Sequence, residues 1–149
     1  MIRYATREDM PWIVKVQGSY PDVIHFVLGG DALMRVINNK QIIVNEADDG
    51  SAIYAMVRFD VADGYLNIRT VLTDPDYVGQ GHARLIYQYL WAMYPLPIKY
   101  IVEENSEGEQ IWAKRSEAVE NVTALTRTFT NRGRTFHEYV VPYGGTTNV

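Results

Sequence analysis

The strongest constraint on the fold is a strand, a glycine turn, a helix and a second strand that follow one another directly. Residues 65–73 and 98–104 are rich in β-branched and aromatic side chains, as strands are. Between them, apolar residues recur at helical spacing, at Leu85, Ile86, Tyr89, Leu90 and Met93. Pro95 and Pro97 end this helix. Such a unit predicts two parallel neighbouring strands joined by a right-handed crossover.

Two more strands precede this unit. Residues 41–46 and 52–60 have a similar composition, and Asp-Gly pairs at 49–50 and 63–64 separate the three strands. Such turns join antiparallel neighbours, so the three strands are predicted to form a meander. Alternation places five polar or aromatic residues on one sheet face, either as a solvated surface or as a receptor for an acidic acceptor: Tyr54, Arg58, Tyr65, Asn67 and Arg69.

The first third of the chain predicts one strand and several short helices. Residues 1–5 have strand character, and Thr6 or Asp9 is positioned to cap the helix that follows. Asp22 and Asp31 precede two further apolar sets at helical spacing. We therefore expect these two aspartates to be the N-caps of two more short helices.

The last third predicts a helix and a closing hairpin. Ser106 and Glu109 form a capping box, which predicts a helix that turns Ile111 and Trp112 inward. Residues 131–133 separate two strand-like runs, and residues 144–149 are expected to fray. Together, the elements predict an α+β fold with a twisted, mostly antiparallel central sheet, one parallel βαβ crossover and flanking helices.

Length and composition are those of one globular domain. The 149 residues suit a single core, and 47% hydrophobic and 21% charged residues are ordinary values, so we expect one domain over 1–149. Charged residues interrupt any apolar stretch near the start, which predicts a cytoplasmic protein without a signal peptide or a membrane segment.

Two classes of site are not expected. The chain has no cysteine and only three histidines, which argues against a metal centre. Its net charge of −4 argues against binding to nucleic acid, because such proteins usually present a basic face.

The most informative segment is the turn before the long helix, Thr73-Asp74-Pro75-Asp76-Tyr77-Val78-Gly79-Gln80-Gly81-His82-Ala83. Glycines at a helix start let several backbone N–H groups approach one anion, and the helix dipole adds partial positive charge. Such a turn suits a pyrophosphate. The same glycines also fit a tight turn that binds nothing, and the turn alone does not separate these interpretations.

This turn and the order of the elements resemble the GNAT acetyltransferases over nearly the whole chain. In that family, a valine-x-proline-x-tyrosine pattern precedes arginine or glutamine, two residues, glycine, one residue, and glycine or alanine. Here Gly81 and Ala83 take the two small positions, and Val78 takes that of the arginine or glutamine. The resemblance implies that residues 79–83 hold the pyrophosphate of acetyl-coenzyme A and that residues 72–73 pair with its pantetheine arm. The implied coenzyme-binding residues are Leu72, Thr73, Val78, Gly79, Gln80, Gly81, His82, Ala83 and Asn105.

The resemblance also bears on the strand at 98–104. The family commonly has an asparagine at the end of this strand, which Asn105 matches, and a tyrosine seven residues later that protonates the departing thiolate. Trp112 stands at the tyrosine position, and an indole cannot act as a general acid. Tyr100 or a water could supply this proton instead, and Glu103 or Glu104 on the same strand could act as the base. Tyr100 and Glu103 are the candidate catalytic residues, with packed or solvated roles as the alternative. The backbone near Leu72 is the candidate oxyanion donor.

The implied function is transfer of an acetyl group from acetyl-coenzyme A to an amine of a small molecule or protein, without a metal. One alternative is a catalytically degenerate GNAT-fold protein that acts by binding a partner protein. A second is an unrelated α+β module whose turn binds nothing. The expected partner is an amine substrate of open identity, and a protein partner and a homodimer also stay open.

Overall fold

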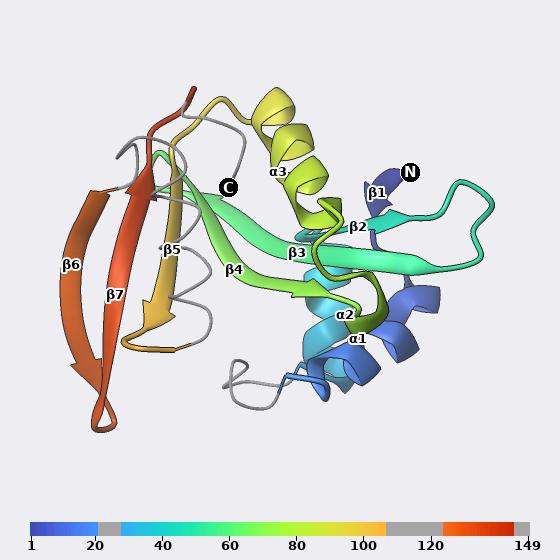
Figure 1. The fold of residues 1–149 in the computed structure, drawn as a ribbon, viewed down its shortest axis with the longest axis horizontal. Helices are drawn as coiled ribbons and strands as arrows, with labels where there is room; N and C mark the ends of the chain where they lie inside the picture. The colour runs from blue at the N-terminus through green and yellow to red at the C-terminus, as the bar shows by residue number, and fades with distance from the viewer. Residues whose placement is uncertain (21–27, 107–123, 145–149) are drawn as a thin grey trace. The chain divides into compact units, whose positions relative to one another are not determined.

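A computed structural model describes residues 1–20, 28–106 and 124–144. The strands predicted from the sequence are all present in this part of the chain and differ from the prediction only at their ends. In chain order, the elements are β1 (Ile2–Tyr4), η1 (Arg7–Asp9), α1 (Met10–Gln17), α2 (Gly30–Asn38), β2 (Ile42–Glu46), β3 (Ile53–Ala62), β4 (Tyr65–Thr73), η2 (Pro75–Tyr77), α3 (His82–Met93), β5 (Ile98–Glu103), β6 (Ala124–Asn131) and β7 (Arg134–Val141) (Figure 1).

The seven strands belong to one mixed sheet in the order β1-β2-β3-β4-β5-β7-β6. The pairs β1–β2, β2–β3, β5–β7 and β6–β7 are antiparallel, whereas β4 and β5 are parallel neighbours. This pattern confirms the α+β fold class and the strand–helix–strand unit predicted from residues 65–104.

The chain divides into two compact units, each made of two segments. The first unit comprises Met1–Phe59 and Thr70–Tyr89, and the second comprises Asp60–Arg69 and Leu90–Val149. The boundaries fall inside β3, β4 and α3.

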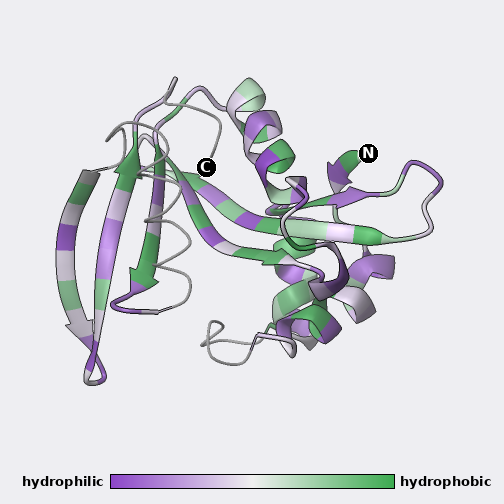
Figure 2. Cartoon of the chain, viewed as in Figure 1, coloured by the Kyte–Doolittle hydropathy of each residue, from purple (hydrophilic) through white to green (hydrophobic). Residues whose placement is uncertain are grey.

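In the first unit, helices cover both faces of the strands. Apolar residues of α1 and α2 pack on one face of the sheet, and Figure 1 shows the start of α3 on the other. The Asn45 side chain of β2 reaches that second face and donates from Nδ2 to the His82 carbonyl at 3.3 Å. In Figure 2, the helices carry both hydrophobic and hydrophilic residues, as expected of helices that bury one side. The core beneath α1 and α2 consists of Ala5, Ile13, Val16, Leu33, Val36, Ile37, Ile42, Val44, Met56 and Leu72.

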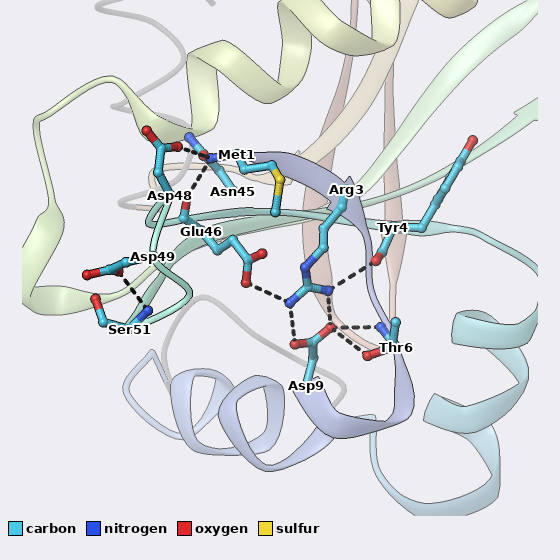
Figure 3. Close-up of polar contacts among 10 residues, drawn as sticks. All are labelled: Met1, Arg3, Tyr4, Thr6, Asp9, Asn45, Glu46, Asp48, Asp49 and Ser51. Atoms are coloured by element: carbon cyan, nitrogen blue, oxygen red, sulfur yellow. Dashed lines mark hydrogen bonds and ion pairs between the residues drawn. The ribbon is translucent and has the colours of Figure 1, made fainter.

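A charged network joins β1, η1 and β2 (Figure 3). The Arg3 guanidinium donates to both oxygens of Asp9, at 2.7 and 2.9 Å, and to Glu46 Oε2 at 2.9 Å. Asp9 Oδ2 also accepts from the Thr6 N–H at 2.7 Å, and Thr6 is the N-cap of η1, as predicted. Burial by itself raises the pKa of the Asp9 carboxyl, but the hydrogen bonds from Arg3 and Thr6 outweigh burial and lower it. The Arg3 hydrogen bond likewise lowers the pKa of Glu46.

The start of α2 differs from the prediction. Gly29, with extended backbone at φ −149° and ψ 172°, is the N-cap, and Asp31 lies inside the first turn. The prediction that Asp31 caps the helix was therefore wrong. At its actual position, the carboxylate still faces the positive end of the helix dipole. The helix predicted after Asp22 falls at residues 21–27, outside the described residues.

In the second unit, two hairpins have tight two-residue turns. Positive φ angles occur at Asp63 (55°) and Gly64 (79°), and at Arg132 (51°) and Gly133 (76°). Two consecutive left-handed residues match the twist of antiparallel strands, so both predicted hairpins are confirmed. The apolar core of this unit includes Leu66, Ile68, Leu90, Trp91, Ile98, Tyr100 and Val141.

The helix after β5 and the chain end are not described. The predicted capping box at Ser106 and Glu109, with Trp112, extends into residues 107–123, and the predicted frayed tail lies mainly at 145–149, so these predictions lie outside the described residues. Within the described ranges, no helix is long and apolar enough to cross a membrane. The prediction of a single domain over 1–149 stays a prediction.

Candidate functional site

The glycine turn has backbone angles that side-chain-bearing residues rarely adopt. After β4, Asp74 caps η2 by accepting from the Asp76 N–H at 3.0 Å, and α3 begins at His82. Between η2 and α3, Gly79 has φ +81° and Gly81 has φ +82°. Both are left-handed conformations, which glycine adopts without a steric penalty. The turn thus requires glycine at both positions.

The turn presents its backbone N–H groups without internal acceptors. The first N–H of α3 that bonds to a carbonyl is that of Leu85, which donates to Gly81 at 3.2 Å. In the described part of the chain, the N–H groups of residues 79–84 have no acceptor. A Cβ built on Gly79 or Gly81 meets no atom within 4 Å, so the surface of the turn is open. Unpaired N–H groups at the positive end of a helix are a binding site for an anion.

Three aromatic rings of the first unit pack together beside the turn. The His82 ring stacks on Tyr54 of β3, with centroids 4.0 Å apart, and Tyr77 meets Tyr54 edge to face at 4.7 Å. His82 Nε2 lies 3.1 Å from Gln80 Oε1. Burial lowers the pKa of His82, which keeps its imidazole neutral near pH 7. The predicted residues Gln80 and His82 thus fix the shape of the turn through their side chains.

Hydrogen bonds with Tyr20 and Tyr54 hold the end of β4. Tyr20 Oη donates to the Thr73 carbonyl at 2.6 Å, and the Asp74 N–H donates to the Tyr54 carbonyl at 2.8 Å. The Leu72 side chain is only 2% exposed and belongs to the core, so Leu72 has only its backbone to offer a ligand. No sequence pattern pointed to Tyr20, because its partner is 53 residues away.

The predicted residues of β5 lie in the second unit, whereas residues 72–83 lie in the first. Tyr100 is 3% exposed and stacks on Tyr139 at 5.4 Å. Glu103 forms an ion pair with Arg134 at 3.8 Å. By strand alternation, Tyr100 and Glu103 lie on opposite faces of β5. Asn105 follows the strand end, exposed, with φ +59°.

The polar face predicted on the meander is partly closed by an internal ion pair. Arg69 Nε lies 2.6 Å from Asp60 Oδ2, and Asn67 Nδ2 donates to Asp60 Oδ1 at 3.0 Å. Asn67 and Arg69 therefore do share a face, but Asp60 already binds the guanidinium. Among the described residues, no cluster of three or more His, Asp or Glu side chains could hold a metal ion.

Comparison with solved structures decides the fold. A ribosomal-protein-alanine N-acetyltransferase from Brucella melitensis superposes with a TM-score of 0.69 at 13% identity, over 94% of this chain and 98% of that one. A GNAT-family acetyltransferase from Listeria monocytogenes superposes with a TM-score of 0.63 at 10% identity, over 93% of this chain and 92% of that one. The chain has the GNAT fold.

The GNAT fold is also shared by an enzyme whose structure contains the coenzyme. N-acetylglutamate synthase from Neisseria gonorrhoeae, complexed with coenzyme A and N-acetyl-glutamate, superposes with a TM-score of 0.69 at 11% identity, over 95% of this chain and 35% of that one. No protein-family model matches this sequence, and no curated protein matches it. The GNAT fold is thus recognisable from the arrangement of elements, at identities too low for sequence comparison.

Proposed function

We propose that the protein is an acetyl-coenzyme A-dependent N-acetyltransferase that acetylates an amine of a small molecule or a protein. The observation that carries this proposal is the open glycine turn at the start of α3, in a chain with the GNAT fold. Its N–H groups at residues 79–84 have no acceptor in the described residues, and both glycines have left-handed backbone. This arrangement fits a pyrophosphate.

The coenzyme would be held mainly by backbone groups. The N–H groups of residues 79–83 would bind the pyrophosphate, and the backbone of Leu72 and Thr73 would pair with the pantetheine arm. Val78 is 61% exposed, but its side chain has no polar atom to offer the coenzyme. Binding by the turn would therefore depend on the backbone N–H groups and on the helix dipole. Asn105 is proposed as a further contact.

The remaining requirements of the reaction fall on a few residues. Acetyl-coenzyme A would supply the activated acetyl group. An attacking amine has to lose a proton, and charge on the carbonyl oxygen needs a donor, for which the backbone near Leu72 is proposed. Tyr100 and Glu103 are proposed as the proton-transfer groups. Because they lie on opposite faces of β5, each needs its own test.

We propose either a small molecule or a protein as the acceptor, because solved structures with the GNAT fold include enzymes of both kinds. The Brucella melitensis enzyme is a ribosomal-protein-alanine N-acetyltransferase. The Neisseria gonorrhoeae synthase was solved in complex with a small molecule, N-acetyl-glutamate. The fold thus serves both kinds of acceptor.

Two measurements, made one after the other, test the proposal. Isothermal titration calorimetry with acetyl-coenzyme A is expected to give saturable binding at one site. Acetylation of a panel of polyamines, aminoglycosides, peptide N-termini and lysine peptides is then expected to reveal turnover. Binding without turnover would favour the degenerate, partner-binding alternative, and absence of binding would mean that this GNAT fold does not bind the coenzyme at the glycine turn.

A further inference from the structure

Two hydrogen bonds from distant parts of the chain fix the peptide group that follows β4. The carbonyl of Thr73 accepts from Tyr20 Oη at 2.6 Å, and the N–H of Asp74 donates to the Tyr54 carbonyl at 2.8 Å. All four residues belong to the first unit. The peptide group is therefore held at its oxygen end and at its hydrogen end, and both hydrogen bonds oppose its rotation.

The direction of these bonds places Tyr20 on one edge of β4. No peptide bond in the described chain is cis, and in a trans peptide the C=O and N–H point in opposite directions. The Asp74 N–H points to β3, so the Thr73 carbonyl and the Tyr20 phenol lie on the opposite edge.

The Tyr20 side chain is itself held in place. Tyr20 packs, partly buried, against the core beneath α1 and α2, and its N–H donates to the Gln17 carbonyl at 3.2 Å. The Gln17 side chain, 4% exposed, bonds Leu28 twice: Nε2 donates to the carbonyl and Oε1 accepts from the N–H, both at 2.9 Å. The end of α1 and the segment before α2 are thereby clamped together, and the phenol is delivered to a fixed point.

We propose that Tyr20 is a positioning residue of the coenzyme site. Its phenol holds the Thr73–Asp74 peptide, and so orients the backbone of Leu72 and Thr73 that would pair with the pantetheine arm. The inference rests on the proposed function. The proposal separates two parts of coenzyme binding. The glycine turn would bind the pyrophosphate, and Tyr20 would orient the backbone that pairs with the pantetheine arm.

The test compares two ligands by calorimetry. One is coenzyme A, and the other is adenosine 3′-phosphate 5′-diphosphate, which has the same phosphates and no pantetheine. Tyr20→Phe keeps the ring and removes the hydroxyl. We expect it to weaken coenzyme A binding about three- to tenfold, the value of one hydrogen bond, and to leave the affinity for the adenosine half unchanged.

Two other variants sharpen the comparison. Tyr89→Phe removes the hydroxyl of an exposed tyrosine on α3 and is the matched control, with both affinities unchanged. Gln17→Leu removes the clamp on Leu28 and is expected to shift the two affinities as Tyr20→Phe does. Thermal unfolding of each variant verifies that it is folded.

Three outcomes would overturn the inference. Equal coenzyme A affinity in the parent and in Tyr20→Phe would show that the phenol does not orient the arm. A parallel loss for both ligands would show that Tyr20 supports the turn or the fold as a whole. If the parent binds neither ligand, the proposed function fails, and this inference fails with it.

Discussion

At the scale of single residues, Gly81 is a position where an added side chain is expected to prevent coenzyme A binding. Its φ of +82° is unfavourable for a β-branched residue, and an added side chain would stand where the turn is open. Gly81→Val is expected to abolish coenzyme A binding, measured by calorimetry, in a protein that still folds. Gly64→Val is the control: its φ is +79°, it is equally open, and it lies in the β3–β4 hairpin. Wild-type affinity in Gly81→Val would make the turn purely structural.

Tyr100 offers a test of the proposed proton transfer. Tyr100→Phe keeps the ring that stacks on Tyr139 and removes the acidic hydroxyl. We expect kcat to fall by about 10²-fold, in the range typical of general acid catalysis, with coenzyme affinity unchanged. Tyr139→Phe preserves the same stack and serves as control. Full turnover in Tyr100→Phe would leave Glu103 as the remaining candidate, and Glu103→Gln tests it in the same assay.

Some residues of the candidate site were predictable from a local sequence pattern, and others were not. Gly79 and Gly81 were predictable, because a strand-to-helix turn with open backbone needs glycine. The Tyr54–His82 stack and the Tyr20–Thr73 bond were not, since each joins residues far apart in the sequence. Only packing of the whole unit brings these pairs together.

At the scale of elements, Arg3 ties β1 and β2 to η1. The side chain of Asp9 is 5% exposed and that of Arg3 is 28% exposed, so loss of the guanidinium leaves a buried carboxylate without its main donor. Arg3→Met is expected to lower the free energy of unfolding by about 2 kcal/mol at pH 7, measured by urea denaturation. Arg134→Met, which breaks a more exposed pair with Glu103, is the control, with an expected loss of about 0–1 kcal/mol. Equal losses would contradict the account.

The same network predicts a pH dependence of defined sign. The folded-state pKa of Asp9 is lowered, so its contribution is present above the unfolded value of about 3.9 and is lost as pH falls through the folded value. Arg3→Met removes the hydrogen bonds and the charge of the guanidinium, so burial is opposed only by the hydrogen bonds from Thr6 and the pKa of Asp9 moves upward. The stability difference between parent and variant should therefore shrink as pH falls below about 4. Urea titrations from pH 7 to 3 measure it, and a constant difference would contradict the mechanism.

Element boundaries were predictable where turn chemistry is explicit. The Asp-Gly pair at 63–64 and the Arg-Gly pair at 132–133 adopt the two left-handed conformations that tight hairpins need. The start of α2 was not predictable in the same way, because Asp31 and Gly29 are both acceptable N-caps. The backbone conformation, and not the residue type, selected Gly29.

At the scale of the whole molecule, ligand binding should appear as thermal stability. A ligand that binds only the folded state at about 100 times its Kd adds about 2.7 kcal/mol, which raises Tm by about 5–10 °C for a protein of this size. Acetyl-coenzyme A is expected to give such a shift in the parent, measured by calorimetry or fluorescence. The shift should persist in Gly64→Val and vanish in Gly81→Val. A shift of the same size in both variants would place binding elsewhere.

The overall fold was predictable because the order of elements is restrictive. A parallel β4–β5 pair with α3 as its crossover, preceded by a meander and followed by a hairpin, leaves few arrangements open. The division of the chain into two units was not predictable, since its boundaries run through the middle of β3, β4 and α3. No change in composition marks those points.

That division has a consequence for synthesis on the ribosome. Residues 60–69 belong to the second unit but are translated between the two segments of the first. Leu66 and Ile68, buried in the finished protein, pair with Ile98 and Tyr100, and β5 in turn pairs with β7. Translation proceeds at roughly 5–20 residues per second. The β3–β4 hairpin therefore waits several seconds before β5 and β7, which complete its sheet, have been synthesised. The nascent chain thus exposes an apolar strand edge during this interval, when encounter with another nascent chain favours aggregation.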